Sequence, residues 1–238
     1  MAIFFVSDVH LSPERAQVTS AFYEFLSSHA RKATDLFILG DLFETWIGDD
    51  DPSDLAVTTQ IRLKELTLSG TKLFVQHGNR DFLLGRRFMN KTGAILIHDY
   101  HVFEAYNQRI LVTHGDLLCS DDHAYQAFRR KTRNPVYRWI LSHLPLSKRQ
   151  EMASRWRAET TRQSSRKPSS IMDVSHATVQ RVMSTTNTVK LIHGHTHKPA
   201  RHELGIGGKE RVVLGDWESS GWAVKLDHKG IELFDFEI

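Results

Sequence analysis

The sequence has few of the features that mark exported or membrane-spanning proteins. It contains one cysteine, Cys119, in 238 residues, which excludes a disulfide framework and suits a reducing cytoplasm. No apolar run approaches the length of a membrane span, and the first apolar run, from Ile3, follows no basic region of a signal peptide. With 40% hydrophobic and 25% charged residues, no repeat and no linker, the chain is expected to form one cytoplasmic domain over residues 1–238.

Five short apolar runs end directly in polar residues. They are IFFV at 3–6, LFIL at 36–39, LFVQ at 73–76, ILVT at 110–113 and VKLI at 189–192. Each is rich in β-branched and aromatic residues, which predicts a buried strand that runs into a loop. Because ligands bind outside the carboxyl ends of the strands in sheets of this kind, we expect the five polar tails to meet at one rim.

The polar tails contain seven potential metal ligands. They are Asp8, His10, Asp41, Asn79, His114, His195 and His197. This set offers carboxylate, amide and imidazole donors without a thiolate, which suits Mn, Fe, Zn or Mg better than a structural zinc site. Seven ligands fit two ions roughly 3.5–4 Å apart that share a carboxylate. Asp41, which follows a glycine that allows a sharp turn, is the natural bridge.

The ordered set of tails resembles the calcineurin-like metallophosphoesterase superfamily. Its motifs are Asp8-x-His10, Gly40-Asp41, Gly78-Asn79-Arg80-Asp81, His114-Gly115-Asp116 and Gly194-His195-Thr196-His197. The resemblance implies an α/β fold in which two mixed β-sheets form a sandwich flanked by helices. It also implies one metal ion on Asp8, His10, Asp41 and His197, and a second on Asp41, Asn79, His114 and His195.

Arg80 departs from the pattern of many superfamily members, which have a histidine after the asparagine as a general acid. Arginine stays protonated and cannot deliver a proton at neutral pH, but it can hold a phosphate by two parallel hydrogen bonds. The leaving group is therefore expected to need no proton. A pyrophosphate bond meets this condition, because the departing phosphate monoester has a second pKa of about 6.

Residues 129–167 are both basic and apolar. They include twelve Lys or Arg and two acids, a net charge of +10 in a chain whose formal total is +3. Apolar residues such as Trp139, Ile140 and Leu141 are interleaved, so we expect a helical insertion at about 121–170 that caps the rim and meets acyl chains and membrane phosphates. A helix capped by Asp121 or Asp122 should end near Arg133, and a second should resume after Pro135.

More specific motifs resemble one branch of the superfamily, the UDP-2,3-diacylglucosamine hydrolase family of lipid A biosynthesis. They are Phe43-Glu44-Thr45-Trp46-Ile47-Gly48-Asp49-Asp50, Gly78 to Gly85, Cys119-Ser120-Asp121-Asp122, Tyr125 to Arg129 and Ile171-Met172-Asp173-Val174. The resemblance implies substrate contacts at Asn79, Arg80, Asp122, Tyr125, Arg157, Thr160, Ser164, Lys167 and His195, with Trp46 as a pocket wall. Thr160 and Ser164 match the family pattern loosely.

This resemblance implies hydrolysis of UDP-2,3-diacylglucosamine to UMP and 2,3-diacylglucosamine 1-phosphate. Hydroxide activated by two Mn²⁺ ions, or by Mg²⁺ or another divalent ion, would attack the α-phosphorus, with catalytic roles for Asn79, Arg80, His114 and His195. We expect a monomer at the cytoplasmic face of the inner membrane.

Two other function classes stay open on the sequence. A nucleotide or cyclic-nucleotide phosphodiesterase could use the same fold. A scaffold protein could also keep the metallophosphoesterase fold but act only by binding, as a membrane- or nucleic-acid-associated adaptor. The complete ligand set argues against a scaffold. Nucleic-acid binding is not expected, because that function favours a basic groove with stacking aromatics over an apolar run such as Trp139-Ile140-Leu141.

Several other segments are interpreted as structural. An amphipathic helix is predicted at 18–32, and Gly205 to Lys209 form a hairpin turn. Strands at 211–214, 222–226 and 231–236 are predicted to be antiparallel and to complete a second sheet. We expect Asp81 and Asp116 to orient neighbouring imidazoles, and residues 49–51 to form a solvated acidic loop.

Overall fold

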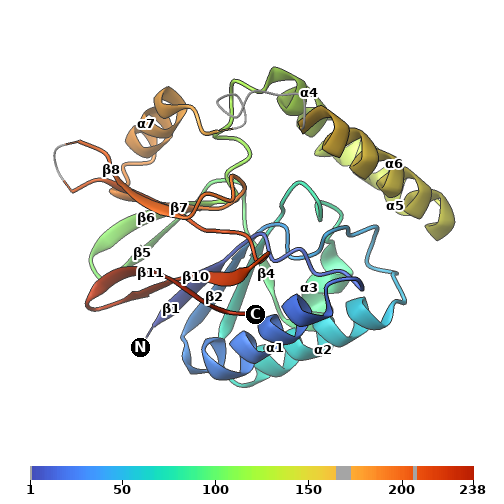
Figure 1. Cartoon of the computed structure of the whole chain (residues 1–238), viewed down its shortest axis with the longest axis horizontal. Coiled ribbons are helices and arrows are strands. Elements are labelled where there is room, and N and C mark those ends of the chain that lie inside the picture. Colours follow the sequence, from blue (N-terminus) through green and yellow to red (C-terminus); the bar gives the residue numbers. More distant parts are fainter. Residues whose placement is uncertain (1, 165–172, 206–207) are drawn as a thin grey trace.

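The computed structural model describes residues 2–164, 173–205 and 208–238, and for residues 158–164 it describes the course of the helix alone. Two mixed β-sheets lie face to face, with helices on their outer sides (Figure 1). The predicted α/β sandwich of two mixed, helix-flanked sheets is therefore confirmed.

The first sheet has six strands. In spatial order they are β11 (Gly230–Glu237), β10 (Ser220–Asp227), β1 (Ile3–Val6), β2 (Asp35–Leu39), β3 (Lys72–Gln76) and β4 (Ile95–Leu96). Strands β1 to β4 are parallel, and β10 joins β1 in antiparallel register.

The second sheet has five strands. In spatial order they are β5 (His101–Ala105), β6 (Gln108–Thr113), β7 (Lys190–His193), β9 (Glu210–Val213) and β8 (Ala200–Glu203). Strands β6, β7 and β9 are parallel to one another. The five predicted apolar runs are thus β1, β2, β3, β6 and β7, and within each sheet their polar tails leave from the same edge.

Successive side chains of β1 point alternately into two apolar cores. Ile3 and Phe5 of β1 point into the core between the two sheets, while Phe4 and Val6 pack under the outer helices of the first sheet. Those helices are α1 (Ala16–Ser28), η1 (Ala30–Lys32), α2 (Asp54–Leu68) and α3 (Arg86–Thr92). Helix α7 (His176–Thr185) covers the second sheet through Val179, Val182 and Met183.

Two predictions about the C-terminal strands were wrong. Strand β9 at 210–213 is parallel to its neighbour β7, and β10 and β11 extend the first sheet instead of completing the second. A strand buried on both faces shows no alternation that reveals its direction, so the pairing of β9 could not be read from its residues. The antiparallel pairing of β10 with β11 and of β8 with β9 agrees with prediction.

Helices α4 (His123–Thr132), α5 (Pro135–His143) and α6 (Leu146–Ser164), here called the cap helices, lie together beyond the strand ends (Figure 1). Asp122 caps α4 as predicted, because its carboxylate accepts a hydrogen bond of 3.0 Å from the Tyr125 N–H. Pro135 separates α4 from α5 and occupies the first turn of α5, where its missing N–H costs nothing.

Candidate metal centre and active site

The structure brings the seven predicted ligands to one place. Ligand atoms of Asp8, His10 and His197 lie within 4.8 Å of one another, and so do those of Asp8, Asp41 and His114. His114 Nε2 lies 3.0 Å from Asn79 Oδ1 and 3.2 Å from His195 Nδ1, which connects the remaining two residues to the cluster.

The backbone is unusual at five of these seven residues. Asp8, His10 and Asp41 each have φ of 53°, His195 has 70° and His197 has 54°. This left-handed region is costly for residues with a Cβ and persists only where the surrounding structure enforces it. The chain therefore turns sharply after β1, β2 and β7 and aims these side chains at a common centre.

Two glycines allow the loops to approach the cluster closely. A Cβ on Gly78 would overlap the Asp41 carboxylate, and one on Gly194 would overlap Ser7 Oγ and Asp8 Oδ2. Instead, the Asp8 carboxylate accepts a hydrogen bond of 2.9 Å from the His195 N–H, next to Gly194. This bond ties the end of β1 to the end of β7 across the seam between the sheets.

Three imidazoles have one nitrogen within 3.3 Å of an oxygen outside the cluster. His114 Nδ1 lies 2.9 Å from the Leu39 carbonyl, and His10 Nδ1 lies 3.0 Å from Glu44 Oε2. His197 Nδ1 lies 3.3 Å from Asp216 Oδ2. Such contacts fix the ring and leave the other nitrogen to bind a metal.

Sequence reasoning assigned no such role to Glu44 and overlooked Asp216. A signal for Asp216 was present, because the apolar run Val212-Val213-Leu214 is followed by Gly215-Asp216, the same pattern that precedes Asp41. Glu44 lies within the motif from Phe43 to Asp50, but its contact with His10 depends on the turn after Asp41, so the sequence does not reveal it.

The cluster fits a divalent cation. Among the described residues, Asp8 Oδ1 and His10 Nε2 face the centre and are buried without a well-oriented hydrogen bond. His10 Nδ1 also lacks one, although it lies 3.0 Å from Glu44 Oε2. Burial alone would lower the pKa of His197, yet Asp216 and Asp8 raise it to about 10. Although burial opposes it, the imidazoles hold the pKa of Asp8 far below its usual range. The carboxylates thus create a site that favours positive charge, and the donor set suits Mn, Fe, Zn or Mg.

Asp81 and Asp116 differ from the expectation that they orient imidazoles. The Asp81 carboxylate accepts hydrogen bonds of 2.8 Å from the N–H groups of Gly78 and Leu42, so it holds the loop backbone. Burial and the nearby Asp41 raise its pKa to about 6. Asp116 Oδ2 accepts hydrogen bonds of 2.7 Å from Tyr125 and Arg129 of α4.

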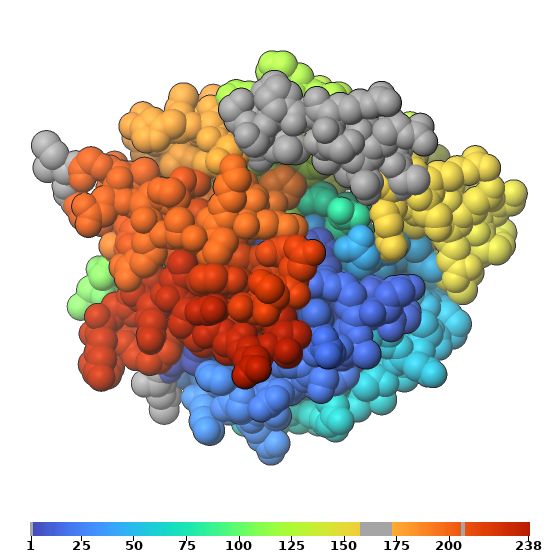
Figure 2. All heavy atoms as spheres, in the orientation of Figure 1, coloured from blue at the N-terminus to red at the C-terminus, as the bar shows by residue number. Residues whose placement is uncertain are grey.

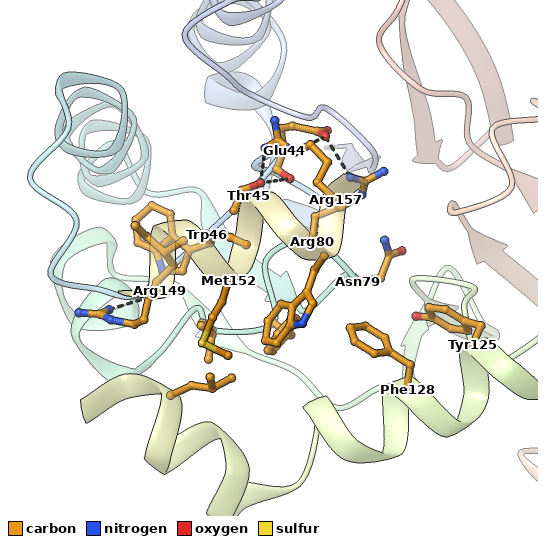
Figure 3. A pocket seen from close by; sticks show the side chains of 16 residues that line it. Glu44, Thr45, Trp46, Asn79, Arg80, Tyr125, Phe128, Arg149, Met152 and Arg157 are labelled. Carbon is orange, nitrogen blue, oxygen red and sulfur yellow. Dashed lines mark hydrogen bonds and ion pairs between the residues drawn. The ribbon is translucent and has the colours of Figure 1, made fainter. Parts of the chain in front are cut away.

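An apolar slot opens beside the cluster, between the cap helices and the loops after β2 and β3 (Figure 3). Asn79, Arg80 and Tyr125 line it at the end toward the metal ligands. Its apolar walls come from the loops after β2 and β3 and from the cap helices. They are Trp46, Ile47, Phe82, Leu83, Phe128, Leu141, Met152, Ala153 and Trp156.

Two arginines meet at the polar end of the slot. Arg80 Nη1 donates to Glu44 Oε1 at 3.0 Å, and Arg157 of α6 lies 3.5 Å from the same oxygen and also donates to Thr45 (Figure 3). Arg80 also donates its backbone N–H to Asp41 at 2.8 Å. Glu44 therefore links a candidate metal ligand, His10, to two cations that can hold phosphate.

Some of the other predicted substrate contacts lie at the slot or beside a candidate ligand, and others lie outside the described residues. Trp46 lines the slot but is only 2% exposed, and its indole donates to Asp49 at 3.1 Å. Asp122 is the cap of α4, and Tyr125 lies beside His195 with ring centroids 5.7 Å apart. Lys167 and the side chains of Thr160 and Ser164 lie outside the described residues.

The residues of the run Trp139-Ile140-Leu141 divide between the slot and the surface. Leu141 is buried and lines the slot. Trp139 and Ile140 are 62% and 46% exposed and do not line it. On a helix, consecutive residues point in different directions, so one apolar run cannot place all three side chains in one slot.

Arginines attach the cap helices to the sheets. Arg129 joins Asp116 to Asp99, at 2.7 and 2.8 Å, and Arg133 donates to the Gly78 carbonyl at 2.8 Å. Arg149 binds Asp50 and the Ile47 carbonyl, each at 2.7 Å. Much of the positive charge of the insertion is therefore used within the molecule.

The sequence predicts a solvated acidic loop at 49–51, but two of its carboxylates have partners within the protein. Asp50 pairs with Arg149, and Asp49 accepts hydrogen bonds from the N–H groups of Gly85 and Phe88 at 2.9 and 3.0 Å. Both carboxylates hold structure together. The loop sequence alone could not reveal this, because the partners are distant in the chain.

The calcineurin-like phosphoesterase family model matches residues 1–199. The chain belongs to this family. As a calcineurin-like phosphoesterase it is a metal-dependent hydrolase, and the resemblance stated from the motifs is confirmed.

Curated relatives place this phosphoesterase within a narrower group. A UDP-2,3-diacylglucosamine hydrolase of Pseudomonas fluorescens Pf-5 is 46% identical, with 98% of this chain and 95% of the relative covered. One from Azotobacter vinelandii is 44% identical, with both chains covered completely. An archaeal phosphodiesterase structure has a TM-score of 0.51 at 13% identity, covering 99% and 100% of the two chains, which supports the fold alone.

In the part of this phosphoesterase that the structure describes, no helix combines the length and the apolar character needed to cross a membrane. The longest helix described, α6, carries charged residues along its length.

Proposed function

We propose that the protein hydrolyses the pyrophosphate bond of UDP-2,3-diacylglucosamine, releasing UMP and 2,3-diacylglucosamine 1-phosphate for lipid A biosynthesis. The observation that supports this proposal is that the candidate metal centre and the apolar slot share residues. Asn79 and Arg80 belong both to the rim of candidate metal ligands and to the wall of an apolar slot. A substrate with a diphosphate and acyl chains fits this combination, and the names of the curated relatives support it.

The proposed cofactors are two Mn²⁺ ions, for which Mg²⁺ or another divalent ion can substitute. One ion would be held by Asp8, His10, Asp41 and His197, and the other by Asp41, Asn79, His114 and His195. When bound, such a pair supplies activation of water and neutralisation of charge on the phosphorus under attack.

The chain's own residues would bind and orient the diphosphate. Arg80 and Arg157 would exchange part of their contact with Glu44 for phosphate oxygens, since charge-assisted bonds to phosphate are strong. Arg80 donates no proton, and the departing phosphate monoester needs none. Tyr125 and Asp122 are proposed to complete the polar end of the site, with Thr160, Ser164 and Lys167.

The slot would take acyl chains, and Phe82, Phe128 and Trp156 would keep water out of it. A substrate of this kind resides in a bilayer. We therefore propose that the protein is a monomer that works peripherally at the cytoplasmic face of the inner membrane, with no nucleic-acid partner.

Turnover of four compounds tests the proposal. UDP-2,3-diacylglucosamine is expected to be cleaved much faster than UDP-glucose, cyclic AMP or a chromogenic phosphomonoester, because only the first can fill both the slot and the rim. Asp41→Ala and His114→Ala should abolish the activity and leave a folded protein. Preference for cyclic AMP would instead support the alternative, a nucleotide or cyclic-nucleotide phosphodiesterase.

The position of attack can be measured separately. Attack at the α-phosphorus, which bears the uridine, expels 2,3-diacylglucosamine 1-phosphate as a phosphate monoester that needs no protonation. In oxygen-18 water we expect label in UMP and none in the lipid product. Label in the lipid product would mean that the substrate lies in the reverse direction, and the phosphate role of Arg80 would be reassigned.

A further inference from the structure

Glu44 is the one acid that lines the apolar slot in the part of the chain that the structure describes, and it lies at the polar end. Its Oε2 lies 3.0 Å from His10 Nδ1. Its Oε1 accepts a hydrogen bond of 3.0 Å from Arg80 Nη1 and lies 3.5 Å from Arg157 Nε (Figure 3). A carboxylate beside two arginines that are proposed to hold phosphate repels every anion that binds there.

The charge of Glu44 acts at short range and in partly buried surroundings. The side chain of Glu44 is 22% exposed and that of Arg80 is 27% exposed. In the space-filling view, yellow atoms of the cap helices lie directly beside blue atoms of the first part of the chain (Figure 2). Arg157 of α6 makes such a contact, with Glu44 and Thr45. Because water and salt screen partly buried charges less than exposed ones, Glu44 acts on any anion held here.

The two arginines keep the capacity to bind a phosphate beside Glu44. Arg80 Nε is buried and has no hydrogen-bond partner among the described residues. Arg157 faces Glu44 with Nε and donates to Thr45 with Nη2. Since a guanidinium group has five N–H donors, a phosphate can bind both arginines while the carboxylate stays close. The phosphate and the carboxylate are then neighbours, and their charges repel.

Hydrolysis changes the charge of the phosphate at this end of the slot. In the proposed substrate, each phosphate of the diphosphate carries one negative charge. When hydroxide becomes an oxygen of UMP, its proton passes to solvent, the bond from the α-phosphorus to the bridging oxygen breaks, and the electron pair stays on that oxygen. The sugar phosphate leaves as a monoester with a second pKa of about 6, so it carries two negative charges at about pH 8.

We propose that Glu44 makes the pair of Arg80 and Arg157 favour a singly charged phosphate over a doubly charged one, and thereby the substrate over its lipid product. The benefit of this preference rests on the proposed function, because the repulsion by Glu44 increases when the bond has broken. The carboxylate regains its full contact with both arginines as 2,3-diacylglucosamine 1-phosphate leaves. Glu44 is thus a specificity-determining residue that lowers affinity for the substrate and hastens release of the product.

A purely structural role for Glu44 has the opposite signature. If the carboxylate only holds the two arginines in place, its removal loosens them and weakens the binding of both kinds of phosphate to a similar extent. If its charge acts on the ligand, its removal strengthens the binding of both. The dianion gains more, because the repulsion is proportional to the charge of the anion.

The test is calorimetric binding of two probes to the Mn²⁺-loaded protein at about pH 8, where dodecyl phosphate is a dianion and dodecyl methyl phosphate is a monoanion. Glu44→Gln should tighten the binding of dodecyl phosphate by roughly tenfold more than that of dodecyl methyl phosphate. Glu104→Gln is the matched control, because Glu104 also accepts from an arginine, Arg109, at 3.0 Å but does not line the slot. This variant should bind both probes as the wild type does.

Glutamine keeps an oxygen that can accept from His10, and titration with Mn²⁺ checks that Glu44→Gln still takes up metal. Glu44→Ala takes its place if circular dichroism shows misfolding or if the metal is lost. Similar changes in the affinity for both probes, or weaker binding of both, overturn the inference and leave the proposed function standing.

The same preference is measured during turnover. In Glu44→Gln, the ratio of the inhibition constant of 2,3-diacylglucosamine 1-phosphate to KM for UDP-2,3-diacylglucosamine should fall by roughly tenfold. An unchanged ratio overturns the inference. Failure of the wild type to hydrolyse this substrate overturns the proposed function, whereas the result with the two probes stands.

Discussion

At the scale of single residues, the candidate centre depends on side chains that contact the candidate ligands without being ligands themselves. Asp216 lies 3.3 Å from His197 Nδ1, and the other nitrogen of that ring lies 3.3 Å from Asp8 Oδ1. Without Asp216 the imidazole loses both its fixed rotation and the charge that supports its basicity. The position of one carboxylate thus determines how well a neighbouring ring can bind metal.

Asp216→Asn is therefore expected to weaken Mn²⁺ binding by about 10–100-fold, measured by isothermal titration calorimetry. Asp227→Asn is the matched control, because Asp227 pairs with Lys225 at 3.0 Å in the hairpin between β10 and β11. Unchanged affinity in Asp216→Asn would remove the assigned role.

The seven candidate ligands could be predicted because each follows an apolar run, so one local pattern places it at the rim. Glu44 and the cap arginines could not be assigned in the same way. The partners of Arg129, Asp116 and Asp99, lie 13 and 30 positions away in the sequence, and only the folded chain brings them into contact. Long-range pairs of this kind leave no periodic signal.

At the scale of elements, the sequence indicated the strands better than their pairing. Five runs with polar tails became five strands in the expected places. Strand β9 is buried at three of its four residues, and its direction was misjudged. The cap helices were predictable from Asp122 and Pro135, but their attachment through Arg133 and Arg149 was not.

The attachment of α6 should depend on pH. The hydrogen bond from Arg149, which outweighs the effect of partial burial, lowers the pKa of Asp50 below its ordinary value of 3.8. A carboxylate whose pKa is lowered by folding contributes stability that is fully present above its unfolded pKa and is lost as the pH falls through the folded pKa.

Hydrogen exchange of α6 amides, corrected for the intrinsic rate, should therefore accelerate in the wild type between about pH 5 and pH 2. In Arg149→Met the helix should be less protected already at the upper end of this range, with a smaller further change. Loss of metal in acid affects both proteins, so the difference between them reports on the Asp50–Arg149 pair. Identical profiles would argue against this attachment.

At the scale of the whole molecule, the apolar slot lies beside the candidate metal centre, and a substitution in its wall can test whether it holds acyl chains. Met152 lines the slot and Ile140 does not. Met152→Ala should raise KM for a long-chain substrate by about tenfold and leave KM for a short-chain analogue nearly unchanged. Ile140→Ala in detergent micelles is the control. Equal effects of Met152→Ala on both substrates would mean that the slot only supports the fold.

Removal of metal should also affect the entire fold. Four candidate ligands follow strands of the first sheet and three follow strands of the second. Because the unfolded chain has no such cluster, each ion at a hundredfold excess over its Kd would stabilise the native state by about 2.7 kcal/mol. Chelator should therefore lower the melting temperature in calorimetry, and Mn²⁺ should restore it. A melting temperature that is insensitive to both would show that no ion bridges the sheets.

The order of these residues along the chain also has a consequence for biosynthesis. The first candidate ligand is Asp8, but His197 and its partner Asp216 come near the other end of the 238 residues. A ribosome-bound chain can form the first three parallel strands early, whereas the centre is incomplete until β7 and the loop after β9 have emerged. Metal capture would then be one of the last events of synthesis, and a nascent chain truncated before residue 190 should lack the complete high-affinity centre.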